Sequence, residues 1–137
     1  MEIELNFEDV FVEAQLMSEQ IGKKVNNWDH HRIADEDEDQ LRFWFCDGLT
    51  MVNVLLDRLI KGKVVTNTTN NKAKMNLLVN NDSATLIGDS VRHLIANHML
   101  VRWLKIVAPD VALVWAEEEK NKEQALLRLA YYREMPY

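Results

Sequence analysis

The last third of the chain, residues 82–137, constrains the fold most, because it predicts two long helices joined at a proline. Apolar residues recur at helical spacing from Leu86 to Val107. They cover well over half of the helix circumference, which is typical of a helix at the centre of a bundle or buried by a partner. Pro109 suits the first turn of a second helix, where its missing N–H costs nothing. We therefore expect a helical fold built around residues 82–107.

The second of these helices changes character along its length. It begins with Val111 and Trp115, runs through residues 117–124 without an apolar side chain, and becomes apolar again at residues 125–130. Glu118 and Lys122 have the i,i+4 spacing that stabilises a helix through such a gap. A helix that is polar on all sides either projects from the body or crosses a solvated gap. We expect residues 117–137 to form a C-terminal helix that can project.

Two more helices are predicted in the first half. Asn6 is a helix cap followed three residues later by Asp9, and Gly22 is a stop signal. Residues 25–34 form a connection in which we expect Trp28 and Ile33 to reach the core. The acidic run at residues 35–39 then precedes an apolar stripe at 3.6-residue spacing, which Lys61-Gly62-Lys63 closes. The stripe consists of Leu41, Trp44, Phe45, Gly48, Val52, Leu55, Leu56 and Leu59.

Residues 64–79 allow two interpretations. The β-branched residues at 64–69 favour strands or a loop, and the second half of the segment is either a short helix or the return strand of a hairpin. The whole chain has only four Gly and two Pro, which disfavours a turn-rich sandwich or barrel. We predict one all-α domain over residues 1–137, four-helix bundle-like, with an optional small β-hairpin near residues 64–79.

Charge and cysteine content limit the compartment and the partners. The net charge is −6, so we expect no direct nucleic-acid binding, which relies on cationic surfaces. Arg92, Arg102 and Lys105 make residues 82–107 the most basic helix, but a helix that fills the core cannot also enter a DNA groove. Cys46 is the single cysteine, and the chain shows no signal-peptide pattern and no membrane span. We predict a cytoplasmic protein that is not associated with a membrane.

The sequence contains no recognisable catalytic or metal-binding motif. Residues 35–46 place acids at some ligand positions of a calcium loop, but Gln40 and Cys46 stand where that loop requires Gly and Glu. His93 and His98 are five residues apart, whereas a helical zinc pair needs four. We therefore predict a protein that is not an enzyme and has no catalytic residue, metal or cofactor. The alternative, an unrecognised helical active site, would need Asp89, His93 and Asn97 to line a cleft.

Aromatic and cationic residues of the last third are candidates for a protein interface, because interfaces favour Trp, Tyr and Arg. The candidate interface residues are Trp103, Trp115, Tyr131, Tyr132, Arg133 and Tyr137. The alternative is that these side chains are partly buried within their own domain. On the first interpretation the partners are proteins, and self-association is expected.

Two segments resemble a known family. Residues 35–60, with an acidic start and an apolar helix, and residues 82–107, which include the run IANHMLVRWL, look like small helical virion proteins of tailed bacteriophages and prophages, of the head-to-tail connector or adaptor kind. The end of the chain, LAYYREMP at residues 129–136, is similar to the terminal helix ending of such proteins. The resemblance implies a ring-forming virion subunit that docks on the portal or the tail and has no active site. The N-terminal helix and residues 64–79 depart from the short core of that family.

The leading hypothesis is therefore a non-enzymatic structural or assembly protein that acts through protein–protein contacts, as a phage or prophage connector-type subunit. The alternative is a small acidic regulatory or immunity-type binding module. In that alternative the acidic N-terminal half mimics a polyanion or caps a basic partner, and charge reversal at residues 35–39 is expected to weaken partner capture. Residues 1–61 hold 14 acidic and 6 basic side chains, and residues 62–137 hold 8 and 10, so the acidity is concentrated in the first half.

Overall fold

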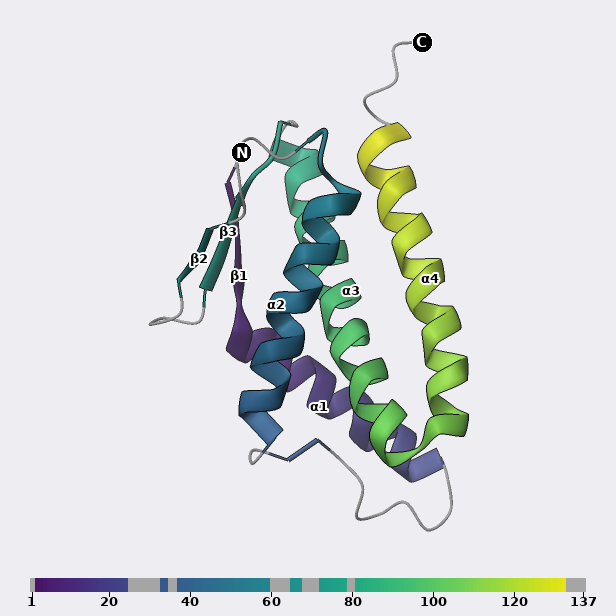
Figure 1. Ribbon diagram of the computed structural model, residues 1–137. Coiled ribbons are helices and arrows are strands. Elements are labelled where there is room, and N and C mark those ends of the chain that lie inside the picture. Colours follow the sequence, from purple (N-terminus) through teal and green to yellow (C-terminus); the bar gives the residue numbers. More distant parts are fainter. Residues whose placement is uncertain are drawn as a thin grey trace.

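The computed structural model describes residues 2–24, 33–34, 37–59, 65–67, 72–78 and 81–132. Within these ranges the chain forms the helices α1 (Phe7–Lys24), α2 (Glu38–Leu55), α3 (Asn81–Val107) and α4 (Pro109–Tyr132). A small sheet is formed by β1 (Glu2–Asn6), β2 (Val65–Asn67) and β3 (Lys72–Asn76). The sheet lies at one side of the helices (Figure 1). The predicted bundle-like helical domain with a small hairpin is confirmed.

The central element is α3, as its apolar circumference predicted. It packs against α1, α2, α4 and β1, and α4 runs back along it from the joint at Ala108 (Figure 1). Residues 94–101 are eight consecutive positions that are all buried. A helix can bury every side of two successive turns only when it has neighbours all round. In this fold, neighbours from the same chain supply that burial.

The end of α4 packs against the domain where projection was expected. Leu126 and Ala130 are fully buried. The Tyr131 hydroxyl donates a hydrogen bond of 2.7 Å to the carbonyl oxygen of Leu55, at the end of α2. Residues 117–132 therefore belong to the body of the domain, because the apolar stripe resumes in phase after the polar gap. The remainder of the predicted projecting segment, residues 133–137, lies outside the described residues.

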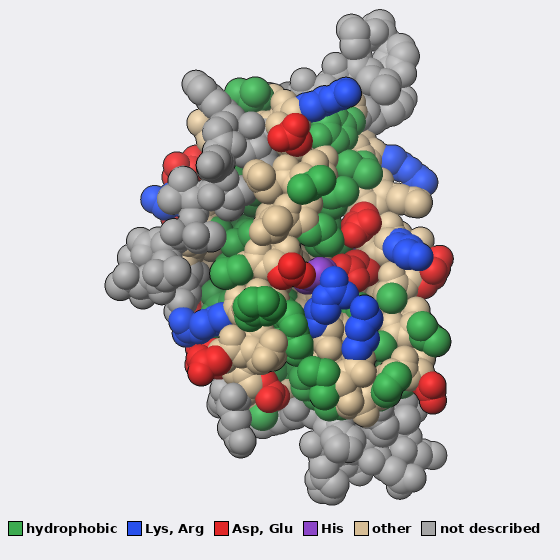
Figure 2. Space-filling view, viewed as in Figure 1, with side chains coloured by type: hydrophobic (Ala, Val, Ile, Leu, Met, Phe, Trp, Pro, Cys, Tyr) green, Lys and Arg blue, Asp and Glu red, His purple; other side chains and the backbone are tan. Residues whose placement is uncertain are grey.

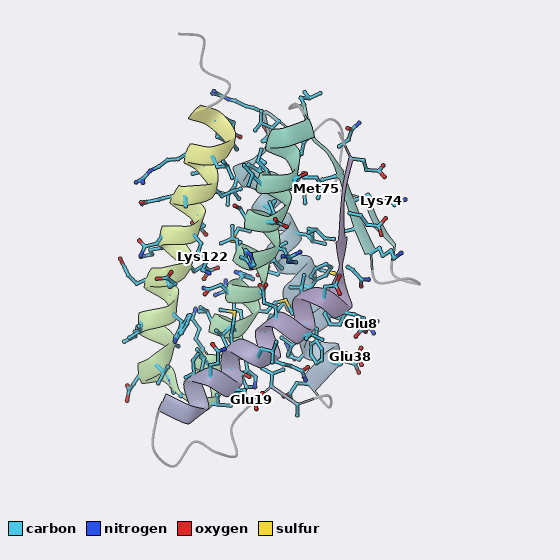
Figure 3. The ribbon with its side chains drawn as sticks, turned by 180° about the vertical axis from the view of Figure 1, so that it is seen from behind. Glu8, Glu19, Glu38, Lys74, Met75 and Lys122 are labelled. Atoms are coloured by element: carbon cyan, nitrogen blue, oxygen red, sulfur yellow. The ribbon has the colours of Figure 1, made fainter. Side chains whose placement is uncertain are left out.

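The hairpin at residues 64–79 exists, and a third strand that was not predicted completes it. The strand order is β1-β3-β2, with both pairings antiparallel. Leu5 lies opposite Ala73, and both are buried. Met75 is buried on the side of β3 that faces the helices, whereas Lys74 is exposed on the other side (Figure 3). The alternation of acidic and apolar residues at positions 2–5 is the period-two signal of such a strand.

Local contacts at the start of α1 agree with the sequence. The Asn6 side chain accepts a hydrogen bond of 3.0 Å from the backbone N–H of Glu8, as a helix cap does. Phe7 stacks with Phe11 and meets Phe45 edge-on, and the guanidinium of Arg42 lies over the Phe7 ring. A hydrogen bond to Glu38 raises the pKa of Arg42 above its ordinary value.

The connection to α2 is anchored at Ile33, which is fully buried. Its backbone N–H donates to the Ser18 hydroxyl, and its carbonyl accepts from the Gln15 side chain. The Asp37 carboxylate accepts from the N–H of Ala34, directly before α2 begins. The described part of the acidic run therefore contributes to the helix start, while Trp28, Asp35 and Glu36 lie outside the described residues.

Candidate functional site

The structure separates the candidate interface residues. Trp103 is buried in the core. Tyr131 is partly buried and hydrogen bonded to α2, and Trp115 is partly buried beside a surface groove. The side chain of Tyr132, and the whole of Arg133 and Tyr137, lie outside the described residues. Trp103 is therefore a core residue, and Trp115 and Tyr131 are partly buried within their own domain, as the alternative interpretation expects.

The polar middle of α4 contributes a buried carboxylate to a polar cluster that joins three helices. Glu119 is only 9% exposed, although it stands among exposed charged neighbours. Its carboxylate lies 2.6 Å from Nδ1 of His98 on α3, and Nε2 of the same ring lies 2.8 Å from a carboxylate oxygen of Asp47 on α2. We call Asp47, His98 and Glu119 the interhelical triad. It joins α2, α3 and α4.

Both nitrogens of the His98 ring lie within hydrogen-bond distance of an acidic side chain. An ionised carboxylate can only accept hydrogen bonds, and both imidazole nitrogens face carboxylates. Each contact can form a hydrogen bond with the proton on the imidazole nitrogen or on the carboxyl group that faces it. Arg102 lies 4.0 Å from Asp47 and supplies a positive charge beside the triad. Figure 2 shows histidine atoms between acidic side chains, with cationic side chains next to them.

The helices approach closely at the triad because Gly48 follows Asp47. A Cβ atom at Gly48 would lie 3.1 Å from Cγ2 of Ile95 and 3.5 Å from Cδ2 of His98. A larger side chain here would push α2 away from α3 and lengthen the contact between Asp47 and His98. The glycine therefore positions the triad.

Further polar groups surround the triad. The Asn97 side chain donates a hydrogen bond of 3.2 Å to the carbonyl oxygen of Trp115, which ties α3 to α4 one turn before Glu119. Burial, and then the charge of Glu119, raise the pKa of Glu123, which lies one turn after Glu119. The buried side of α4 is therefore polar for two turns, and its most enclosed carboxylate is the one that contacts His98.

The triad's geometry suits stabilisation better than proton transfer. Each imidazole nitrogen already has a carboxylate partner, so neither is free to take a proton from a substrate. Asp89, His93 and Asn97 do not form the cluster that the enzyme alternative would need. His93 contacts Glu13, Asp89 contacts Arg92, and Asn97 contacts Trp115. No group of three His, Cys, Asp or Glu side chains suited to a metal ion occurs in the part of the chain that the structure describes.

The sequence analysis did not predict the triad, although the helical phase of Glu119 is a signal for it. The apolar stripe of α4 passes through Ala112 and resumes at Leu126 and Ala130. Continuing this stripe through the polar gap at steps of three or four places Glu119 on the buried side. A carboxylate in that phase predicts a buried cationic partner on the facing helix.

Exposed apolar side chains gather at the joint of α3 and α4. Ile106 is 69% exposed, Leu113 is 75% exposed and Val114 is 68% exposed. Figure 2 shows hydrophobic side chains at the surface over this end of the two helices. We call Ile106, Val107, Leu113 and Val114 the joint patch. Isolated exposed apolar residues are ordinary, whereas a cluster of them on one end marks an interaction surface.

A groove borders the joint patch. It has a volume of about 330 Å³ and lies between the second half of α1 and the start of α4. We call it the α1–α4 groove; its lining is mostly apolar and consists of Met17, Gln20, Ile21, Asp110, Val111, Val114 and Trp115. Of the predicted interface residues, Trp115 is the one that the structure places at this surface.

Comparison of the sequence with protein-family models, with curated proteins and with solved structures found no match. No described helix combines the length and the apolar character needed to cross a membrane. We therefore infer a function from the joint patch and the α1–α4 groove.

Proposed function

We propose that this protein is a non-enzymatic assembly protein that acts through protein–protein contacts, and that its first partner is a second copy of itself. The joint patch carries this proposal. Three of its side chains, those of Ile106, Leu113 and Val114, are each more than two thirds exposed. Fully burying one such side chain contributes about 1.5–3 kcal/mol, so leaving several exposed favours association.

A second copy fits because a protruding apolar surface and an apolar hollow lie side by side. Leu113 projects from α4, while Met17 and Ile21 line the neighbouring groove. The two surfaces share Val114 and otherwise differ, so Leu113 of one copy can enter the groove of the next in a head-to-tail contact. Repeated contacts of this kind generate a ring when the rotation closes. Association costs roughly 4–15 kcal/mol in lost freedom of motion, so we expect moderate affinity in the micromolar range.

More specifically, we propose that the protein is a connector-type subunit of a tailed phage or prophage. This proposal rests on the resemblance described for residues 35–60 and 82–107 and on the head-to-tail contact proposed for the two surfaces. Such a subunit resides in the cytoplasm before assembly and in the virion afterwards. Negative-stain electron microscopy tests this role. Closed rings are expected, and a simple dimer would reject the connector role while keeping self-association.

Substitutions on each surface test the contact itself. We expect Leu113→Glu and Met17→Glu each to block assembly, because each places a charge in the apolar contact. A mixture of the two variants should recover dimers but nothing larger, because each mixed pair retains one intact contact. Light scattering after gel filtration measures the masses.

The matched control is Val54→Glu. Val54 is 71% exposed on α2. The nearby end of α2 contacts Tyr131 at the opposite end of α4 from Leu113. A wild-type protein that stays monomeric at all concentrations would overturn the proposal. Equal loss of assembly in Val54→Glu would show that the joint patch is not the contact.

The acidic regulatory module is the second candidate. It predicts that charge reversal at residues 35–39 weakens capture of a basic partner while the fold survives. Asp37 and Glu38 of this run already make contacts within the chain, with Ala34 and Arg42. Unchanged capture by the reversed variant would remove this candidate.

A further inference from the structure

A second surface, away from the joint patch, lies along the outer edge of the sheet. In the sheet that the described residues form, β1 is an edge strand, because the order is β1-β3-β2. One side of β1 pairs with β3 from Glu2 opposite Asn76 to Asn6 opposite Lys72. The other side faces no described strand. The edge of a sheet presents backbone donors and acceptors to which an extended peptide can add as a further strand.

A groove runs along this edge. It has a volume of about 230 Å³, and its lining includes all five residues of β1. The other lining residues are Asp9 of α1 and Thr85, Gly88, Asp89 and Arg92 of α3. Successive strand residues point to opposite faces, so a hollow that touches all five must lie along the edge of the strand. The four α3 residues are spaced as i, i+3, i+4 and i+7, which places them on one face of that helix. We call this hollow the β1 groove.

The β1 strand is held firmly enough to act as a template. Leu5 is buried, and Ile3 packs against the core. Gly88 allows this approach, because a Cβ atom there would lie only 3.2 Å from Cγ2 of Ile3. Figure 3 shows β1 running between β3 and α3. A strand that is already ordered adds little entropic cost when a partner binds.

The charges around the β1 groove select the partner. Glu2, Glu4, Asp9 and Asp89 line it with carboxylates. Arg92 is the one cationic residue in this lining, and it lies 3.6 Å from Asp89 and 3.9 Å from Glu13. Lys72 of β3 lies 3.3 Å from Glu4. Lys74 of β3 also stands opposite Glu4 in the strand register. These four carboxylates therefore outnumber the three cations by one, and this small excess of negative charge attracts a positively charged segment.

We propose that the β1 groove binds an extended, basic segment of another protein, which adds to the sheet as a strand beside β1. Alternate side chains of that segment meet Glu2 and Glu4, which lie on one face of the strand. A second copy of β1 is disfavoured, because antiparallel pairing of two such strands brings their carboxylates together on one face. This inference goes beyond self-association through the joint patch and does not depend on it.

Synthetic peptides provide the probes. The first is Lys-Val-Lys-Val-Lys-Val-Lys, and two matched peptides replace its Lys residues by Glu or its central Val by Pro. The proline peptide keeps the charge but loses a backbone donor and strand compatibility. Fluorescence anisotropy measures binding to the full chain. We expect the first peptide to bind in a salt-sensitive manner, and each control peptide to bind at least about tenfold more weakly.

Variants of the protein locate the binding site. We expect Glu2→Lys to weaken binding of the lysine peptide by about tenfold, because it reverses one lining charge at an exposed position. The matched control is Glu118→Lys, which makes the same change at an exposed position on α4. Circular dichroism verifies that both variants fold.

Three results would overturn the proposal: equal binding of the proline peptide, equal loss in Glu118→Lys, or amide chemical-shift changes in NMR spectra that avoid residues 2–6. If the wild-type protein forms an oligomer and Glu2→Lys dissociates it, the β1 edge is instead an interface with a second copy of the chain. These results are independent of the mass measurements on Leu113→Glu, so failure of one proposal is distinguishable from failure of the other.

Discussion

Replacing one side chain of the interhelical triad should destabilise the protein strongly, although the change affects a single residue. In Glu119→Leu, His98 loses the carboxylate at 2.6 Å while its side chain stays 3% exposed. Breaking a buried ion pair from one side costs about 3–5 kcal/mol. Asp47 remains in contact and its side chain is 51% exposed, so water and Arg102 offset part of the loss. We therefore expect a cost of about 2–4 kcal/mol, a large share of the ~5–15 kcal/mol of a typical domain.

The effects of replacing His98 and Glu119 on the free energy of unfolding should be strongly coupled. In the double variant His98→Leu with Glu119→Leu, no buried charge is left without its partner, so the double variant should cost less than the sum of the single variants. Urea unfolding followed by circular dichroism measures each free energy of unfolding. The control is Glu118→Leu, a neighbouring exposed position where a change within about 0.5 kcal/mol is expected. A loss below about 1 kcal/mol in Glu119→Leu, or additive single effects, would refute the account of the triad.

Three further changes test neighbouring contacts by the same unfolding assay. Gly48→Leu should destabilise the protein by at least about 1–3 kcal/mol, because the side chain would meet Ile95 and His98; a neutral result would contradict the close helix approach. Tyr131→Phe should cost about 0.5–1.5 kcal/mol through loss of its hydrogen bond to Leu55, and no cost would mean that the end of α4 is not held against α2. Burial and Glu119 raise the pKa of Glu123, so the stabilisation linked to its protonation is present at low pH and lost as the pH rises through the raised value. Glu123→Gln should therefore raise stability at neutral pH by about 0.2–0.5 kcal/mol, with the gain disappearing in acid; a gain that persists in acid would contradict this.

The helices could be predicted because their signals are local. Asn6 caps α1, Pro109 opens α4, and the stripe from Leu41 to Leu59 defines the buried side of α2 and the turn after it. Strand β1 is different, since its pairing partner β3 lies about 70 residues away in the sequence. The alternation at residues 2–5 was visible, but five residues form a strand only when a partner edge and α3 cover them.

The triad shows why buried polar contacts are harder to predict than apolar stripes. Asp47, His98 and Glu119 come from three helices, and nothing in their spacing along the chain pairs them. The polar gap in α4 was therefore interpreted as a sign of projection. In the folded protein the gap contains Glu119, the partner of the buried His98 ring, and this contact helps to join α4 to α3.

Self-association is the central claim, and the mass of the wild-type protein in solution tests it most directly. Sedimentation velocity over a micromolar concentration series is the measurement. We predict species whose masses are multiples of the 16.0 kDa chain and whose proportion grows with concentration. A single species of 16.0 kDa at every concentration would contradict the claim.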